Sequence, residues 1–234
     1  MKNNNLKKKK VFSFDKTFSS SIFFAQPHEY KSLEDISKDH KRIINAGSNL
    51  SYSPLGFCRD GISIDLKKFN RIIELDKEKK IITVEAGITL IEFLNFTLKH
   101  DLWIPQLPGY PSITIGGAVA SNSHGKSCGL HGAIRKSVKS IVLFHKNHGL
   151  LKLSENENKD IFDLTIGGLG LTGSIINVTL NLMEIKSTNF ITKRKKVNSV
   201  EECQKIIVKK NDSYIYSWHR ADTTKKFGEG FIFE

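Results

Sequence analysis

Cysteine, proline and long apolar runs are all scarce in this chain of 234 residues. The three cysteines, Cys58, Cys128 and Cys203, are odd in number, widely separated, and form neither a CxxC pair nor a metal-ligand spacing. This pattern excludes a disulfide framework, favours a reducing compartment and gives no reason to expect a metal. No apolar run approaches the ~18 residues that a membrane-spanning helix needs. We therefore expect a cytoplasmic protein whose only membrane contact would be peripheral.

Negative charge is scarce at the two ends of the chain, where the net charge of +12 is concentrated. Residues 1–10 hold five lysines and no acid, and residues 186–234 hold 11 basic against six acidic side chains. A nucleic-acid-binding protein would more often carry its basic face on the folded body, so no nucleic-acid partner is expected. Basic ends fit an anionic membrane surface, an anionic substrate or simple solvation.

What the chain does have is a glycine-rich stretch around which the rest is organised, residues 108–126. It contains small residues almost throughout and ends in His124-Gly125-Lys126. Glycine lets a backbone approach another group closely, at a cost of up to ~1 kcal/mol in regular structure. The stretch therefore predicts either a loop that wraps a ligand or a turn followed by a seam of small residues.

A second loop of small polar residues, 47–53, follows the predicted buried strand 42–46. Successive N–H groups in such a turn can form a concavity that binds an anion, for which a pyrophosphate is a natural guest. The loop matches neither the Walker A nor the GxGxxG pattern, because no Lys-Ser/Thr follows it and no helix opens after it. An ordinary connecting loop is the alternative.

Hydrophobic periodicity predicts short strands with few helices, and hence an α+β fold and not a doubly wound sheet. Thr89 and Glu92 form a capping-box pattern that opens a helix through His100, and Ser32 is the predicted N-cap of an earlier helix. The predicted strands are 21–25, 42–46, 61–66, 71–75, 81–86, 137–144, 150–153 and 177–183.

The composition changes at residue 188, where a strand–helix–strand–strand pattern begins over 189–197, 199–210, 214–220 and 229–233. We expect three regions: a basic disordered tail (1–13), a body (14–187), and the incomplete start of a second α+β domain (188–234).

The order of these motifs resembles the FAD-binding domain of the vanillyl-alcohol oxidase/para-cresol methylhydroxylase (PCMH-type) flavoproteins. The carrying residues are the 47–53 loop, Glu85-Ala86-Gly87, Pro108-Gly109, Thr114-Ile115-Gly116-Gly117, His124-Gly125 and the turn 167–176. Within that family the His124-Gly125-Lys126 run is most similar to the decaprenylphosphoryl-ribose oxidase branch, followed by the aldonolactone oxidases. Residues 45–49 also resemble the corresponding loop of the UDP-N-acetylenolpyruvoylglucosamine reductases, but the His124-Gly125-Lys126 run argues against that group.

The resemblance implies FAD as cofactor, body 14–187 as the FAD domain and 188–234 as the start of a substrate (cap) domain. Its family positions imply three groups of cofactor-binding residues. The pyrophosphate group is Ala46, Gly47, Ser48, Asn49, Leu50, Ser51 and Tyr52. The ribityl and ring group is Gly109, Thr114, Ile115, Gly116 and Gly117. The remaining contacts are Asn122, His124, Gly125, Lys126 and Ser127 at the flavin edge, with Ile175 at the adenine half.

Departures from the family pattern refine these expectations. Covalent members often carry a histidine in the pyrophosphate loop, and Leu50-Ser51-Tyr52 offers none, so non-covalent FAD is expected. Asn49 and Leu50 stand where the named branch often has Gly-Arg. Cys128 is not at the cysteinyl-flavin position and is interpreted as a plain thiol.

The implied function is oxidation of an alcohol carbon of a sugar or sugar-phosphate derivative by hydride transfer to FAD. The substrate would be a small-molecule or lipid-linked sugar. The alternatives are an aldonolactone oxidase of the D-arabinono-1,4-lactone type and a non-catalytic flavin-binding fragment. No catalytic residue is named, because the expected substrate domain is largely absent from the sequence.

Overall fold

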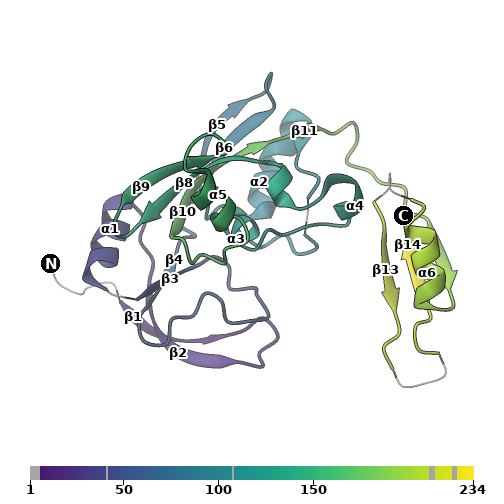
Figure 1. Ribbon diagram of the computed structural model, residues 1–234, viewed down its shortest axis with the longest axis horizontal. Coiled ribbons are helices and arrows are strands. Elements are labelled where there is room, and N and C mark those ends of the chain that lie inside the picture. The colour runs from purple at the N-terminus through teal and green to yellow at the C-terminus, as the bar shows by residue number, and fades with distance from the viewer. Residues whose placement is uncertain (1–5, 41, 107, 211–213, 223–225) are drawn as a thin grey trace.

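The computed structural model describes residues 6–40, 42–106, 108–210, 214–222 and 226–234, and it mixes helices with antiparallel and parallel strands. Figure 1 shows a larger body built from the N-terminal and middle parts of the chain and a smaller C-terminal unit beside it. The α+β prediction is confirmed.

The N-terminal sheet has the strand order β1-β2-β4-β3. Strands β1 and β2 pair antiparallel, whereas β4 pairs in parallel with both β2 and β3. The helix α1 (Tyr30–Asp39) follows β2 and buries Leu33. The strands are β1 (Lys7–Phe12), β2 (Ser19–Ala25), β3 (Ile43–Ala46) and β4 (Ile62–Asp65).

The central sheet is antiparallel, with the strand order β5-β6-β10-β8-β9. Its β-branched and leucine side chains form the largest core, in which Ile82, Val84 and Val178 are completely buried. The predicted hairpin of β5 and β6 is confirmed. The strands are β5 (Ile72–Asp76), β6 (Ile81–Glu85), β8 (Val138–His145), β9 (Gly149–Ser154) and β10 (Ser174–Asn181).

Short helices lie beside this sheet, and β7 pairs with β11 in a two-stranded sheet. Thr89 caps α2 in the predicted capping box, since its side chain accepts from the Glu92 N–H and the Glu92 carboxylate accepts from the Thr89 N–H. The helices are α2 (Leu90–Thr97), η1 (Leu98–His100), α3 (Ile115–Ala120), α4 (Cys128–His131), η2 (Ile134–Lys136) and α5 (Lys159–Thr165); the strands are β7 (Leu102–Trp103) and β11 (Met183–Glu184).

The C-terminal unit is a three-stranded antiparallel sheet of order β12-β14-β13 with one helix. Val197, Cys203 and Ile232 form a small core of its own. Its elements are β12 (Arg194–Val197), α6 (Val200–Ile207), β13 (Tyr216–His219) and β14 (Gly230–Phe233). Ser199 caps α6, since its side chain accepts from the Glu202 N–H.

Two expectations about the first forty residues are wrong. The tail predicted to be disordered over 1–13 contains β1, which pairs with β2 and buries Val11; residues 1–5 lie outside the described part. The helix α1 begins before Ser32, at Tyr30, with Glu29 at its N-cap and no side-chain cap. In β1, pairing with β2 overrides the local pattern.

Among the described residues, no helix is long and apolar enough to cross a bilayer, and no group of His, Cys, Asp or Glu side chains has the arrangement of a metal site.

Candidate cofactor site

The main cleft forms where three connecting segments of the body meet: the loop after β3, the start of α3 and the turn before β10. Its volume is about 330 Å³, within the usual range for small-molecule sites. Among the described residues, no side chain that lines it carries a formal charge. The lining residues include Asn45, Ala46, Gly47, Ser48, Asn49, Leu50, Ser51, Gly87, Thr114, Gly116, Gly117, Ser121, Ser123, Leu169, Gly170, Gly173 and Ile175.

The loop after β3 supplies the cleft with backbone donors. Within the described part of the chain, the N–H groups of Gly47, Ser48, Asn49 and Leu50 donate to no protein acceptor. Asn49 has φ 54°, a left-handed conformation in which successive N–H groups converge on one side of a turn. The loop therefore offers what an anion needs in an uncharged cleft, a group of free amide donors.

The opposite wall is the start of α3. For this stretch the sequence predicted either a loop that wraps a ligand or a seam of small residues, without deciding between them. The Thr114 side chain caps α3 by accepting from the Gly117 N–H at 3.1 Å. The Gly116 N–H donates to the Ala86 carbonyl at 2.7 Å, which anchors α3 against the end of β6. The Ser48 hydroxyl donates to the Ser112 carbonyl at 2.6 Å and ties the two walls together.

Glycine is required at two points of this contact. A Cβ atom on Gly47 would lie 2.3 Å from Thr114 Oγ1, and one on Gly116 would lie 2.8 Å from Ala86 Cβ. Both distances are far below van der Waals contact. The two walls can therefore approach each other only because these residues have no side chain.

One polar atom in the cleft is buried without a partner. Ser123 Oγ is shielded from solvent and makes no hydrogen bond among the described residues, although Ser123 lines the cleft. A buried hydroxyl in this state costs about 1–3 kcal/mol unless a bound molecule satisfies it. The unpaired amides, the glycine contacts and this hydroxyl all fit a flat, anionic dinucleotide.

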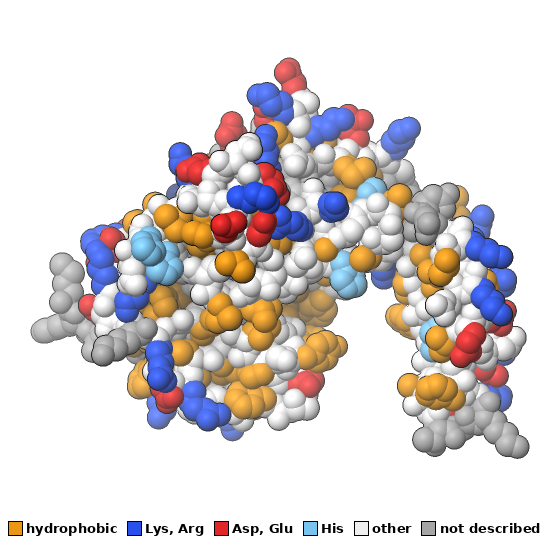
Figure 2. Space-filling view, viewed as in Figure 1, with side chains coloured by type: hydrophobic (Ala, Val, Ile, Leu, Met, Phe, Trp, Pro, Cys, Tyr) orange, Lys and Arg blue, Asp and Glu red, His pale blue; other side chains and the backbone are white. Residues whose placement is uncertain are grey.

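A second cavity of about 450 Å³ lies between the body and the C-terminal unit. Lys126 joins the two parts: its ammonium lies 4.1 Å from the centroid of the Tyr216 ring, and its carbonyl accepts from the Ile215 N–H. Figure 2 shows the hollow between the two parts. The residues lining this cavity are Gly109, His124, Gly125, Lys126, Cys128, Gly129, Ile207, Lys210, Ile215 and Tyr216.

The two cavities gather fourteen of the eighteen predicted cofactor residues. The main cleft holds the 46–51 loop, Thr114, Gly116, Gly117 and Ile175, and the second cavity holds Gly109 and the His124-Gly125-Lys126 run.

Four predicted residues line neither cavity. Ile115 is completely buried in the core and its N–H donates to the Ile88 carbonyl. Tyr52 is 71% exposed and packs edge-on against Phe14. The buried Ser127 hydroxyl donates to the Pro105 carbonyl at 2.6 Å.

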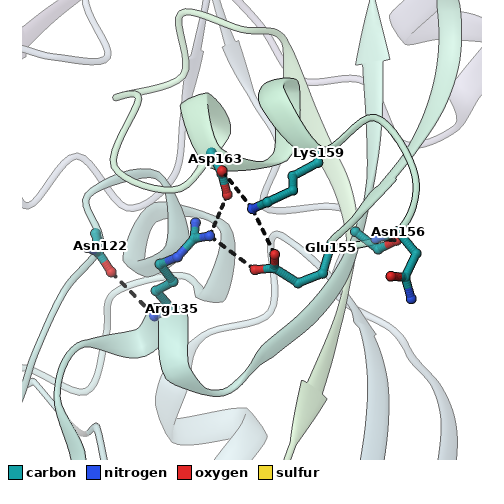
Figure 3. Close-up of polar contacts among 7 residues, drawn as sticks. Asn122, Arg135, Glu155, Asn156, Lys159 and Asp163 are labelled. Atoms are coloured by element: carbon teal, nitrogen blue, oxygen red, sulfur yellow. Dashed lines mark hydrogen bonds and ion pairs between the residues drawn. The ribbon is translucent and has the colours of Figure 1, made fainter.

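Asn122, the fourth, is connected to an ionic network outside the cleft (Figure 3). Its side-chain oxygen accepts from the Arg135 N–H at 3.3 Å, and the Arg135 guanidinium bridges Glu155 and Asp163. Lys159 binds the same two carboxylates, at 2.8 and 2.9 Å. Hydrogen bonds from Lys159 and then Arg135 hold the pKa of Asp163 below its ordinary value.

Sequence reasoning missed much of the turn between α5 and β10. The N–H groups of Gly167 and Leu169 donate to the Val119 and Ala120 carbonyls at the end of α3, so Leu169, Gly170 and Gly173 line the cleft. The glycine-rich turn 167–176 is visible in the sequence, but the family positions assign only Ile175 from it to the cofactor.

Comparison with known proteins identifies the domain. The family model described as "FAD binding domain" matches residues 25–154, more than half of the chain. Among solved structures, alkyldihydroxyacetonephosphate synthase matches with a TM-score of 0.76 at 14% identity, covering 99% of this chain and 52% of that one. The latter likeness shows a shared fold.

Curated proteins with similar sequences support the same family assignment. Decaprenylphosphoryl-beta-D-ribose oxidase of Mycolicibacterium smegmatis is 32% identical over 68% of this chain and 35% of its own length. L-gulonolactone oxidase of Mus musculus is 34% identical over 61% of this chain and 32% of its length. L-galactono-1,4-lactone dehydrogenase of Brassica oleracea is 28% identical over 82% of this chain and 33% of its length. The match thus spans about a third of each relative. The motif order and the geometry of the cleft agree with this result, and the chain belongs to the FAD binding domain family, with FAD as its cofactor.

Proposed function

We propose that this chain forms the FAD-binding part of an oxidoreductase that oxidises an alcohol carbon of a sugar or sugar-phosphate derivative. The observation that carries the proposal is the uncharged main cleft with its free amide donors, beside a second cavity that contains His124 and Lys126. The three relatives reported above are each named for a sugar-derived substrate. Bound FAD would supply the hydride acceptor.

The residues of the chain would bind the cofactor and hold it in a fixed orientation. The N–H groups of the 47–50 loop would hold the pyrophosphate, where each would gain a charge-assisted hydrogen bond. Gly116 and Gly117 would let the ring side of the cofactor lie against α3, and Ser123 would satisfy its hydroxyl on the cofactor. Ile175 would pack on the adenine half.

His124 and Lys126 would act at the substrate side, since they line the second cavity. Lys126 would bring a positive charge to a site for an anionic group such as a sugar phosphate. The His124 Nδ1 atom lies 3.3 Å from the Gly125 carbonyl oxygen. That contact orients the ring within the chain itself, and we assign no residue the role of general base.

The substrate is proposed to be a small-molecule or lipid-linked sugar, and the protein to act in the cytoplasm with peripheral membrane contact through its basic ends. An aldonolactone oxidase is the second candidate, favoured by the lactone names of two relatives. The remaining alternative is a flavin-binding fragment without turnover.

The function is tested by substrate-dependent bleaching of the bound flavin without oxygen. A phosphorylated ribose and an aldonolactone would each be mixed with the flavin-loaded chain and followed by absorbance. Bleaching by only one compound identifies the substrate class. A chain that stays yellow with every compound tested supports the non-catalytic alternative.

A further inference from the structure

The outer face of the β1–β2 hairpin combines positive charge with exposed aromatic rings. Residues directly opposite in an antiparallel pair point to the same face, and residues two apart on a strand share it. Lys8 is opposite Phe23, Lys10 opposite Ser21, and Phe12 opposite Ser19. One face of the hairpin, here called the Lys-Phe face, therefore carries Lys8, Lys10, Phe12 and Phe23.

Burial shows that this face points to solvent. Phe12 is 47% and Phe23 50% exposed, whereas Val11 and Ile22 on the opposite face are 7% and 1% exposed. Figure 2 shows hydrophobic and basic side chains next to each other over the lower part of the body, where β1 and β2 lie. Side chains alternate between the two faces of the hairpin, so Phe12 and Phe23 are exposed to water while Val11 and Ile22 pack into the core.

The charges of this face are not neutralised internally. In the described part of the chain, neither Lys8 nor Lys10 forms an ion pair with a carboxylate. The strand β1 is the edge of its sheet, where lysine discourages unwanted strand pairing. That role accounts for the lysines. It does not account for Phe12 and Phe23 beside them.

We propose that the Lys-Phe face docks on an anionic lipid bilayer. The proposed function includes a peripheral membrane contact, and the Lys-Phe face is the surface that would make it. The docking proposal rests on the proposed function only for its biological setting. The lysines would be drawn to lipid phosphates and carboxylates, and the two rings would leave water at the acyl boundary.

The composition of the face favours lipid over nucleic acid. It carries only lysine, phenylalanine and serine, without the arginine or amide side chains that recognise bases. Nucleic-acid bases also need free aromatic surfaces to stack on. The Lys10 ammonium already lies 5.4 Å from the centroid of the Phe12 ring.

The test measures co-sedimentation of the full flavin-loaded chain with vesicles of phosphatidylcholine alone and with added phosphatidylserine. We expect binding only to the anionic vesicles. The double variant Lys8→Gln/Lys10→Gln should weaken it by roughly thirty-fold. Phe12→Ser/Phe23→Ser should weaken it by roughly ten-fold or more.

Matched controls come from the central sheet. Lys139→Gln/Lys152→Gln removes two exposed strand lysines, and Ile73→Ser/Leu150→Ser removes two half-exposed apolar side chains. Both should bind like the unmodified chain. Equal binding to both vesicle types, equal loss in the controls, or tighter binding of a single-stranded oligonucleotide would each overturn the proposal.

Flavin content is measured in every variant and should not change, which excludes misfolding as the cause of lost binding. Turnover on a soluble sugar is measured separately. Vesicle binding without turnover would contradict the proposed reaction but not the docking proposal. Turnover without vesicle binding would contradict the docking proposal but not the proposed reaction.

Discussion

Thr114 connects the two walls of the main cleft through one side chain. Its hydroxyl caps α3, and the same oxygen occupies the space that any side chain at position 47 would need. Thr114 alone is therefore enough to require glycine at position 47, whatever the cleft binds. Position 109, in contrast, has room for a methyl group, because no atom would lie within 4 Å of a Cβ there.

Gly47→Ala should weaken FAD binding by roughly ten-fold or more, because overpacking at this contact costs about 1–3 kcal/mol. The ratio of flavin to protein absorbance after purification measures the effect. Gly129→Ala is the matched control and should retain its flavin, because no atom would lie within 4 Å of a Cβ there and Gly129 is not a predicted cofactor residue. Equal occupancy in the two variants would show that the contact between Gly47 and Thr114 does not shape the cofactor site.

The link between FAD and protein should be non-covalent. The described residues that line the main cleft include no histidine or cysteine, the usual attachment points. Acid precipitation should leave the yellow colour in the supernatant. Colour in the pellet would instead direct attention to His124 and Cys128, which line the second cavity.

Among the elements, α5 packs Phe162 into the core and also takes part in the ionic network of Figure 3, in which Arg135 and Lys159 share Glu155 and Asp163. The turn that follows α5 forms part of the cleft wall. The network therefore involves the helix that directly precedes Leu169 and Gly170, two residues that line the main cleft.

Acid should remove the contribution of this network. The pKa of Asp163 in the folded chain lies below its ordinary value of 3.8, so the carboxylate stabilises the fold above that value. The stability is lost as the pH falls through the lowered pKa. Asp163→Asn should thus reduce the melting temperature at neutral pH, and the difference from the unmodified chain should vanish in strong acid.

The matched control is Asp160→Asn, which removes an exposed carboxylate of the same helix that forms no ion pair in the described structure. Its melting temperature should follow that of the unmodified chain at every pH. Parallel pH profiles for Asp160→Asn and Asp163→Asn would contradict the assigned role of the network.

Elements that are determined by interactions between residues close in sequence could be predicted from the sequence. The Thr89–Glu92 box and the β5–β6 hairpin are set by neighbouring residues and were predicted correctly. The strand β1 was missed because four lysines look unfolded until β2 pairs with them. On α2, Ile91 is 43% exposed whereas Phe93 is completely buried, because the neighbouring elements decide which face is covered.

The same distinction applies to the cofactor site. The 46–51 loop and the Thr114–Gly117 stretch carry a readable glycine and hydroxyl pattern, and both line the cleft. Ser123 and Leu169 reach it only through the packing of α3 against the turn after α5. No periodicity in the sequence encodes that packing.

At the scale of the whole molecule, the hydrophobic core clusters of the described residues occupy separate parts of the chain. Every residue of the two body clusters lies before 188, and every residue of the third cluster lies after it. The boundary itself stays a prediction. Among the described residues, the contacts that join the parts include the stacking of Tyr214 on Trp103 and the Ile215–Lys126 hydrogen bond.

A chain ending at Ser187 should therefore fold and keep FAD, because its core and its main cleft are complete. Its melting temperature should lie within a few degrees of that of the full chain, since only a small contact surface is lost. Thermal unfolding followed by flavin fluorescence measures both properties. An insoluble or colourless product would show that residues 188–234 are part of the same folding unit.

The pairing of β6 with β10 has a consequence for the order of events during synthesis. Thr83 and Thr179, which meet across this pair, are 96 residues apart in sequence. At a translation rate of about 5–20 residues per second, β6 waits roughly 5–20 s on the ribosome before its partner is made. During that interval Ile82 and Val84 have no β10 to cover them, and the wall of the cleft that precedes β10 does not yet exist. Chaperone protection should therefore matter most in this window, and FAD can stabilise the nascent protein only after it closes.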